Sequence, residues 1–234
     1  MTAGGARERF GSGYPILIID DHELFSTTLT MALRGEGFDA RALPVAAVHD
    51  LLARPAHPPG LVVLDLDLGR DADGRWVNGA DLVEGLRARR WVVLVVSGSV
   101  DEPGTAAAIA AGAVGAVPKS CSFGDLLGTV VTAAGGEPVM TEVQQLEWVE
   151  KHRRFRAQER ELSRRLSRLS HREREVLELL AAGMRATAIA DHFVVSMPTV
   201  RTQIRSILTK LEVGSQLEAV ALLRLLPLGP RRRA

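Results

Sequence analysis

The chain has 234 residues, of which 46% are hydrophobic and 24% charged, with a formal net charge of +1. This length is sufficient for two folded domains. The longest strand-like apolar run, residues 91–96, is far shorter than the roughly 18 apolar residues of a membrane span, so we expect a cytoplasmic protein with no membrane partner. The single cysteine, Cys121, excludes an intramolecular disulfide and a cysteine-based zinc site.

The net charge conceals an uneven distribution along the chain. Residues 14–136 carry nine basic and fifteen acidic side chains, whereas residues 167–234 carry eleven basic and six acidic ones. The two halves are therefore expected to have different partners, and a polyanion is the natural partner of the basic half. Residues 1–13 are rich in glycine and lack an apolar stretch, which predicts a disordered tail and not a secretion signal.

Residues 14–136 alternate short apolar runs with longer amphipathic segments. This alternation predicts an α/β fold, with a doubly wound parallel sheet and helices on both faces. Ser122 is expected to cap the last helix of this region. We expect strands at 16–19, 61–64, 92–96 and 113–117, with a weaker one near 38–43, and helices at 23–34, 45–53, 79–88, 103–111 and 122–134.

Polar side chains follow the predicted strands, at the edge of the sheet where such folds bind ligands. Crowded carboxylates there would repel one another unless a cation lay among them, and an all-oxygen site suits Mg²⁺. A carboxylate so placed can attack phosphorus, while a cation and a lysine neutralise the transferred phosphoryl group. The strand-end residues are Asp20, Asp21, Asp65, Ser97 and Lys119.

Four stretches of this half form a wider pattern: IIDDHELF at 18–25, VVLDL at 62–66, VVSG at 95–98 and AGAVGAVPK at 111–119. In these stretches the chain resembles the receiver domain of two-component response regulators, a flavodoxin-like fold. The resemblance implies a sensor histidine kinase as a partner and Mg²⁺ as a cofactor. By position it implies Asp65 as the phosphate acceptor, Asp20, Asp21, Asp65 and the backbone of Asp67 as metal ligands, and Ser97 and Lys119 as the switch hydroxyl and phosphate-binding lysine.

The chain also departs from the receiver pattern in three places. About six additional residues separate Asp65 from Asn78, the pair after the acceptor is Leu68-Gly69, and Ala116 stands where many relatives carry an aromatic residue. These departures motivate a second hypothesis, in which this half is a receiver-like dimerisation or ligand-sensing module that is not phosphorylated.

A third hypothesis is enzymatic, although we expect the chain not to be an enzyme. Asp65-Leu66-Asp67 resembles the nucleophile and acid/base pair of haloacid-dehalogenase-type phosphatases. That motif normally lies near the start of its domain, and the Gly-Thr-like continuation is absent here. This makes an aspartate-nucleophile phosphatase the weakest of the three interpretations.

Residues 137–166 are rich in Glu, Gln, Arg and Lys, which predicts a long helical linker. An apolar side chain recurs along it every seven residues, whereas the companion heptad position is mostly polar. Two interpretations stay open: a weak or short coiled coil that sets the spacing of two C-terminal domains in a dimer, or a solvated helix that rests one apolar edge on a domain. The apolar series is Trp148, Phe155, Leu162 and Leu169, and the companion series is His152, Glu159 and Leu166.

The basic C-terminal half is expected to contain four helices. Ser170 and Glu173 form a capping box that opens the first helix, and a short second helix carries Ile189 and Phe193. Ser196 caps the third, which has Pro198 in its first turn. Its apolar stripe consists of Val200, Ile204, Ile207, Leu208 and Leu211, and a second capping box, Ser215 to Glu218, begins a last helix that runs to Pro227.

The third of these helices has the features that reading of the DNA major groove requires: one buried stripe, an opposite polar face, and a short helix and tight turn before it. The segment resembles the LuxR-type helix-turn-helix of NarL/FixJ-class response regulators, in stretches such as REREVL at 172–177 and SMPTV at 196–200. A helical protein-interaction bundle is the alternative. By position, the DNA-binding residues are Ser196, Thr199, Arg201, Thr202, Gln203, Arg205 and Lys210.

These features together predict a response-regulator transcription factor that is phosphorylated on Asp65 and binds promoter DNA as a homodimer. The expected organisation is a disordered tail at 1–13, a receiver domain at 14–136 and a helical linker at 137–166, followed by an all-α four-helix helix-turn-helix domain at 167–226 and a basic tail at 227–234.

Overall fold

The computed structural model describes residues 14–53, 60–70, 74–98 and 102–225. The chain divides into two compact units, Met1–Arg153 and Arg154–Ala234, and each is described by itself. The predicted tails at 1–13 and 227–234 lie outside the described residues. No helix of the described part is long and apolar enough to cross a bilayer.

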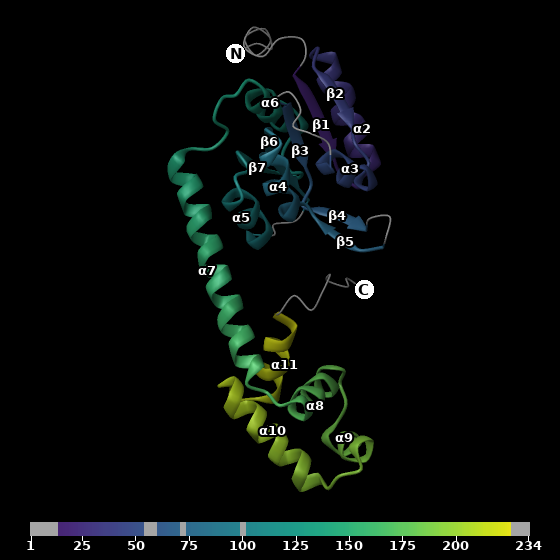
Figure 1. Cartoon of the computed structure of the whole chain (residues 1–234), viewed down its shortest axis with the longest axis vertical. Coiled ribbons are helices and arrows are strands. Elements are labelled where there is room, and N and C mark those ends of the chain that lie inside the picture. The colour runs from purple at the N-terminus through teal and green to yellow at the C-terminus, as the bar shows by residue number, and fades with distance from the viewer. Residues whose placement is uncertain (1–13, 54–59, 71–73, 99–101, 226–234) are drawn as a thin grey trace. The chain divides into compact units, whose positions relative to one another are not determined.

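A five-stranded parallel sheet forms the centre of the first unit (Figure 1), in the order β2-β1-β3-β6-β7. All four strand pairs are parallel. This is the flavodoxin-like strand order, and it confirms the predicted doubly wound fold. The strands are β1 (Pro15–Ile19), β2 (Asp39–Ala42), β3 (Gly60–Leu64), β6 (Trp91–Ser97) and β7 (Gly115–Pro118).

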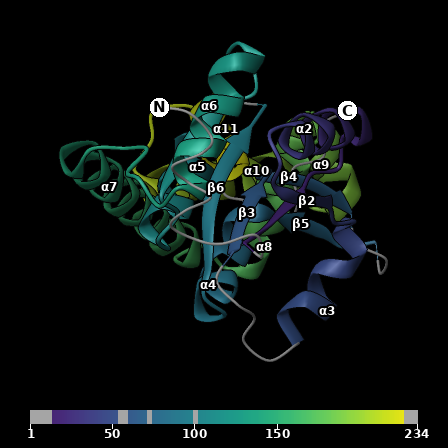
Figure 2. The same cartoon turned by 90° about the horizontal axis from the view of Figure 1, so that it is seen from above.

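Helices cover both faces of this sheet. Figure 2 shows α2 and α6 on one side of the strands and α3 and α4 on the other. Strand side chains alternate between the two faces, so Leu61 and Val63 of β3 pack with α2 and α6, whereas Val62 and Leu64 pack with α3 and α4. The helices are α2 (Glu23–Gly35), α3 (Val48–Ala53), which follows the short 3₁₀ helix η1 (Val45–Ala47), α4 (Gly79–Ala88), α5 (Glu102–Ala110) and α6 (Phe123–Ala134).

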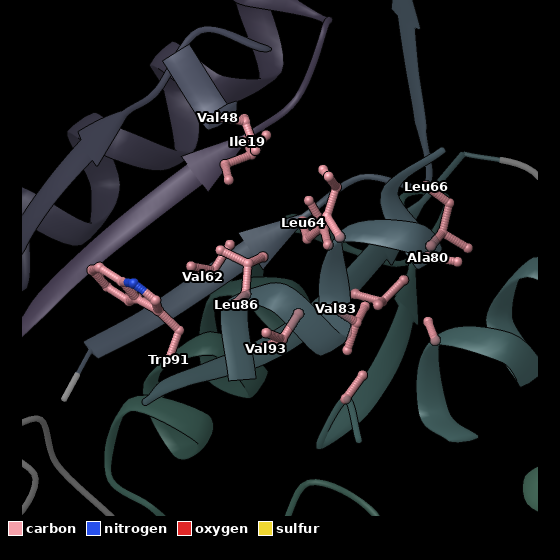
Figure 3. Close-up of a cluster of buried hydrophobic side chains, with 14 of the residues drawn as sticks. Ile19, Val48, Val62, Leu64, Leu66, Ala80, Val83, Leu86, Trp91 and Val93 are labelled. Atoms are coloured by element: carbon pink, nitrogen blue, oxygen red, sulfur yellow. The ribbon is translucent and has the colours of Figure 1, made fainter. Parts of the chain in front are cut away.

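The core on the α4 side is drawn in Figure 3. Val83 and Leu86 of α4 lie beside Val62 of β3 and Val93 of β6, and all four side chains are buried. The helix begins where the Asn78 side chain accepts a hydrogen bond of 2.9 Å from the Ala80 N–H. At the start of α6 the Ser122 hydroxyl caps the helix by accepting from the Asp125 N–H, as predicted.

An antiparallel hairpin, β4 (Asp67–Arg70) and β5 (Trp76–Asn78), was not predicted. It contains most of the additional residues after Asp65. Its strands have only four and three residues, and β4 contains Asp, Gly and Arg, so neither shows the alternation that indicates a strand. Leu68, which is 1% exposed, anchors the hairpin in the core on the α4 side, and the Arg70 guanidinium lies 5.1 Å from the centroid of the Trp76 ring.

Two predicted boundaries in this unit are wrong. The last strand begins at Gly115 and not at 113, because the C-terminal turn of α5 extends through Gly112, which has a φ of +103°, and Ala113 donates to the Ala108 carbonyl. The linker helix α7 (Glu142–Ser167) begins five residues later than predicted. Thr141 caps its first turn, and Val139 before it packs against the core between α2 and α6.

In the described part of the second unit, four complete helices and the C-terminal part of α7 surround one core. The predicted cap contacts of the first and third complete helices are present. Ser170 and Glu173 form the capping box of α8, and the Ser196 hydroxyl accepts from the Thr199 N–H at the start of α10. The last helix ends at Leu225, so the predicted extension to Pro227 lies outside the described residues. The helices are α8 (His171–Ala181), α9 (Ala186–Phe193), α10 (Met197–Leu211) and α11 (Gln216–Leu225).

The heptad series of the linker contributes to this second core. Leu166 and Leu169 are buried there and Leu162 packs against them, together with the apolar stripe of α10. Side chains that fill an intramolecular core cannot also form the seam of a coiled coil. The structure therefore favours the interpretation in which the linker helix rests one apolar edge on a domain.

Leu86→Ala is expected to lower the free energy of unfolding by roughly 2–5 kcal/mol, because Leu86 is fully buried between α4 and the sheet. Leu24→Ala is the matched control. Leu24 is 82% exposed, so its loss is expected to change the free energy by less than about 0.5 kcal/mol. Urea unfolding followed by circular dichroism measures both, and equal effects of the two substitutions would contradict this packing.

Candidate functional site

Three strands bring distant charged residues together at the carboxyl edge of the sheet. Asp20 follows β1, Asp65 follows β3 and Lys119 follows β7. The backbone continues the sheet pairing to this edge, since the Asp65 N–H donates to the Ile19 carbonyl at 2.9 Å and the Lys119 N–H to the Ser97 carbonyl at 2.8 Å. Ser97 itself ends β6 and is 7% exposed.

The ammonium group of Lys119 lies between two buried carboxylates. Its Nζ is 2.5 Å from Asp20 Oδ2 and 2.7 Å from Asp65 Oδ2, and each aspartate side chain is only 2% exposed. The Phe25 ring, whose centroid is 4.7 Å from the same Nζ, adds a cation–π contact. One positive charge, on a side chain that is 14% exposed, thus faces two buried negative charges, which leaves the cluster with excess negative charge.

This arrangement shifts the pKa values of Asp65 and Lys119. Burial raises the pKa of Asp65 above its ordinary value, and the nearby Asp20 charge adds to this, although the Lys119 hydrogen bond acts in the opposite direction. Burial alone would lower the pKa of Lys119, but its bonds to Asp20 and Asp65 outweigh burial and raise it. Lys119 therefore remains an ammonium group at neutral pH.

A third acidic residue and a histidine extend the cluster. His22 Nδ1 lies 2.7 Å from Asp21 Oδ1 and 3.3 Å from Asp20 Oδ1, and one potential ligand atom from each of Asp20, Asp21, His22 and Asp65 lies within 4.8 Å of the others. The Asp67 N–H is 3.3 Å from Asp65 Oδ1, and the Asp67 side chain is exposed. Three carboxylates so close together form a donor set that fits a hard cation such as Mg²⁺.

Several residues that shape this cluster were given no role by the sequence analysis. A Cβ on Gly79 would lie 1.9 Å from the Asp65 carbonyl oxygen, so only glycine permits this approach. Gly69 has a φ of +65° and lies against Asp21. His22 and Phe25 stood in the quoted DDHELF stretch, but only the folded chain shows that they contact the acids and the lysine.

Asp65→Asn is expected to raise the thermal stability of the metal-free protein at pH 7. The pKa of Asp65 is raised in the folded state, so the protonated carboxyl favours folding. This contribution to stability is fully present below the ordinary pKa of aspartate, and it is lost as the pH rises through the folded-state pKa. The gain over wild type should therefore disappear in acid. Thermal unfolding in a chelator at several pH values measures this, with Asp67→Asn as the exposed control; a loss of stability at pH 7 would contradict it.

The second candidate site is the polar face of α10. Arg201 and Arg205 are exposed and one helical turn apart, and in the described part of the chain their guanidinium groups make no ion pair or hydrogen bond. Thr202 donates its hydroxyl to the Pro198 carbonyl at 3.0 Å. The Ser196 and Thr199 hydroxyl groups lie 2.8 Å apart, at the N-terminal end of the helix.

Two other predicted DNA-binding residues are less available at the surface: Lys210 is paired within the domain and Gln203 is half-buried. Lys210 Nζ lies 2.6 Å and 2.9 Å from the two carboxylate oxygens of Glu173, which also accepts from the Ser206 hydroxyl and the Ser170 N–H. Burial opposes ionisation of Glu173, but these bonds outweigh it and lower its pKa to about 2. Gln203 is half-buried, and its Oε1 has no hydrogen-bond partner among the described residues.

Glu173→Gln is expected to lower the free energy of unfolding by roughly 1–3 kcal/mol at pH 7, because it removes the ionised acceptor that joins α8 to α10. Since the pKa is lowered from 4.5 to about 2, this contribution is present above 4.5 and is lost as the pH falls towards 2. Chemical unfolding of the variant and of Glu175→Gln, whose ion pair with Arg172 is solvent-exposed, measures the difference. Similar losses for both variants would contradict the importance of the Glu173 network.

A doubly wound sheet with clustered acids and a lysine at its carboxyl edge, followed by a helix-turn-helix unit, defines a response regulator. Two family models support this: the response regulator receiver domain matches residues 16–131, and the luxR family of bacterial regulatory proteins matches residues 167–223. The chain belongs to the NarL/FixJ class of response regulators, transcription factors with a receiver domain and a LuxR-type DNA-binding domain.

Characterised relatives match most of the chain. The nitrate/nitrite response regulator protein NarL of Escherichia coli K12 is 28% identical over 215 residues, which cover 87% of this chain and 92% of NarL. The response regulator protein VraR of Staphylococcus aureus is 28% identical over 213 residues, covering 88% and 93%.

Solved structures of similar proteins include full-length FixJ from B. japonicum, at 23% identity and a TM-score of 0.41, covering 91% of this chain and 96% of FixJ. RcsB from Salmonella enterica serovar Typhimurium, bound to promoter P1flhDC, has 22% identity and a TM-score of 0.46, covering 90% and 97%. Because both TM-scores are below 0.5, the fold assignment depends on the sheet topology and the family models.

Proposed function

We propose that a sensor histidine kinase phosphorylates Asp65 and that the phosphorylated protein binds promoter DNA as a homodimer. The observation that carries this proposal is the position of Lys119 between the buried carboxylates of Asp20 and Asp65. In this proposal, residues 14–136 form the receiver domain, 137–166 the linker and 167–226 the DNA-binding domain.

In the proposed reaction, a carboxylate oxygen of Asp65 attacks the phosphorus atom of the donor phosphohistidine. A P–O bond to Asp65 forms, and the P–N bond breaks with its electrons remaining on the imidazole. Lys119 supplies positive charge to the phosphoryl oxygens at a position already next to Asp65, and the Ser97 hydroxyl at the end of β6 hydrogen-bonds the product phosphate.

The carboxylates of Asp20, Asp21 and Asp65 and the backbone carbonyl of Asp67 would hold Mg²⁺. When bound, Mg²⁺ supplies further positive charge for the transferred phosphoryl group. The excess negative charge of the cluster, with three acids around one lysine, supports this assignment.

Phosphorylation changes the charge that Lys119 meets. The group on Asp65 goes from one negative charge to about two, with additional acceptor oxygens. These oxygens compete with Asp20 for the ammonium and recruit Ser97, so the phosphorylated site favours a different arrangement of the β6 and β7 ends. Such differential contacts are what a shift towards an active conformation requires.

Promoter binding is assigned to the polar face of α10, in a domain whose formal charge is positive. Arg201 and Arg205 are exposed there and have no ion-pair partner among the described residues, and residues 167–223 match the luxR family of regulatory proteins. Two copies of this domain would read two half-sites, which multiplies the affinity of a single helix.

Incubation with Mg²⁺ and a small phosphodonor is expected to add one acid-labile phosphate to the wild-type protein, as measured by mass spectrometry. Asp65→Asn removes the attacking carboxylate and should gain none. Asp67→Asn is the matched control, because only the backbone carbonyl of Asp67 has a role in the proposal, and it should gain phosphate as wild type does.

Other outcomes of that experiment favour the competing hypotheses. Absence of phosphate on wild type, or its persistence in Asp65→Asn, would reject the proposal in favour of a receiver-like module that is not phosphorylated. Sustained turnover of a phosphate ester that is lost in Asp67→Asn would instead indicate an aspartate-nucleophile phosphatase.

Phosphorylation is also expected to increase both dimer formation and promoter affinity. Sedimentation velocity and a DNA-binding titration at fixed salt, each with and without the phosphodonor, measure the two effects. Equal promoter affinity of wild type and Asp65→Ala under phosphorylating conditions would show that DNA binding is independent of Asp65.

A further inference from the structure

The structure narrows the set of side chains on α10 that have donors available for bases. Intramolecular contacts occupy the Lys210 ammonium and the Thr202 hydroxyl, and the Ser196 and Thr199 hydroxyl groups contact each other. Gln203 is half-buried and its carbonyl oxygen is buried, so its amide cannot make the paired donor and acceptor contact by which glutamine reads adenine.

Arg201 and Arg205 remain. Both are exposed, and among the described residues no acceptor engages either guanidinium group. Neighbouring acids do not hold them: Glu173 pairs with Lys210, and Glu212 pairs with Arg165 and Arg168. Ten planar N–H donors, five from each arginine, thus have no partner on this helix face within the part of the chain that the structure describes.

The spacing of the two arginines matches the spacing of bases. Four residues of α-helix rise about 6 Å, and two base-pair steps rise about 7 Å. Both residues lie in the first nine positions of α10, the part of a recognition helix that contacts base edges.

We propose that Arg201 and Arg205 each read one guanine, the two guanines lying within about two base-pair steps of each other in each half-site. This inference rests on the proposed DNA-binding function. An arginine fork donates in parallel to O6 and N7 of guanine, which is the only base to present two acceptors side by side in the major groove. Lysine is a point donor that lacks this planar geometry, so the two residue types are not interchangeable here.

The test is selection of bound sites from a randomised duplex pool by the full-length, phosphodonor-treated protein, followed by titration of the selected site. Wild type is expected to select two guanines per half-site, and replacing either guanine by adenine should weaken binding about five- to 150-fold. Arg201→Lys and Arg205→Lys should each weaken the preference at one guanine, because a lysine ammonium can bond guanine but lacks the parallel donor pair. The salt dependence should be kept, because the positive charge remains.

Arg224→Lys is the matched control. Arg224 lies on α11 and donates to the Ala181 carbonyl, so this substitution should leave both guanine preferences intact. Selected sites without guanines, or guanine preferences that survive in both arginine variants, would overturn the inference while leaving DNA binding standing. Failure to retain any duplex, even at low salt, would instead overturn the proposed DNA-binding function and this inference with it.

Discussion

The ammonium group of Lys119, shared between the carboxylates of Asp20 and Asp65, is the interaction on which the first unit's chemistry depends. It joins residues that are 99 positions apart in the sequence, and it can form only because β1, β3 and β7 end at the same edge of one sheet. In a buried site one positive charge does not balance two negative ones. The cluster therefore favours additional positive charge. The pKa of Asp65 is raised mainly by burial, and the Asp20 charge adds to this.

Much of the fold could be predicted because its central strands β3 and β6 are buried on both faces. Such strands are continuous apolar runs, as in Val92 to Val96, and they stand out between amphipathic helices. The β4–β5 hairpin could not be predicted in this way, since its stability depends on the burial of Leu68 and on cross-strand contacts such as that between Arg70 and Trp76. The start of α7 was misplaced because the packing of Val139, and not helix propensity, determines where the chain leaves the first core.

The sequence predicts which residues form the candidate sites better than it predicts which partner each side chain takes. Strand ends identify Asp20, Asp65 and Lys119, because chain direction in a parallel sheet determines which residues share an edge. Which partner each side chain takes depends on competition in three dimensions. Lys210 carries the positive charge expected of a phosphate-binding residue, yet it is paired with Glu173. Nothing in the local sequence of α10 indicates a partner on α8, 37 positions earlier.

The two lysine networks differ in a way that bears on regulation. Glu173 and Lys210 form a balanced pair, completed by Ser206 and Ser170, which holds α10 against α8 entirely within the second unit. The Lys119 cluster has excess negative charge. Of the two networks, only this one would change its charge if Asp65 were phosphorylated. The helix that carries Arg201 and Arg205 is thus held by interactions that the proposed phosphorylation of Asp65 would leave unchanged. Under the proposed function, control would therefore act on how copies of the DNA-binding domain come together, and not on the internal structure of the domain.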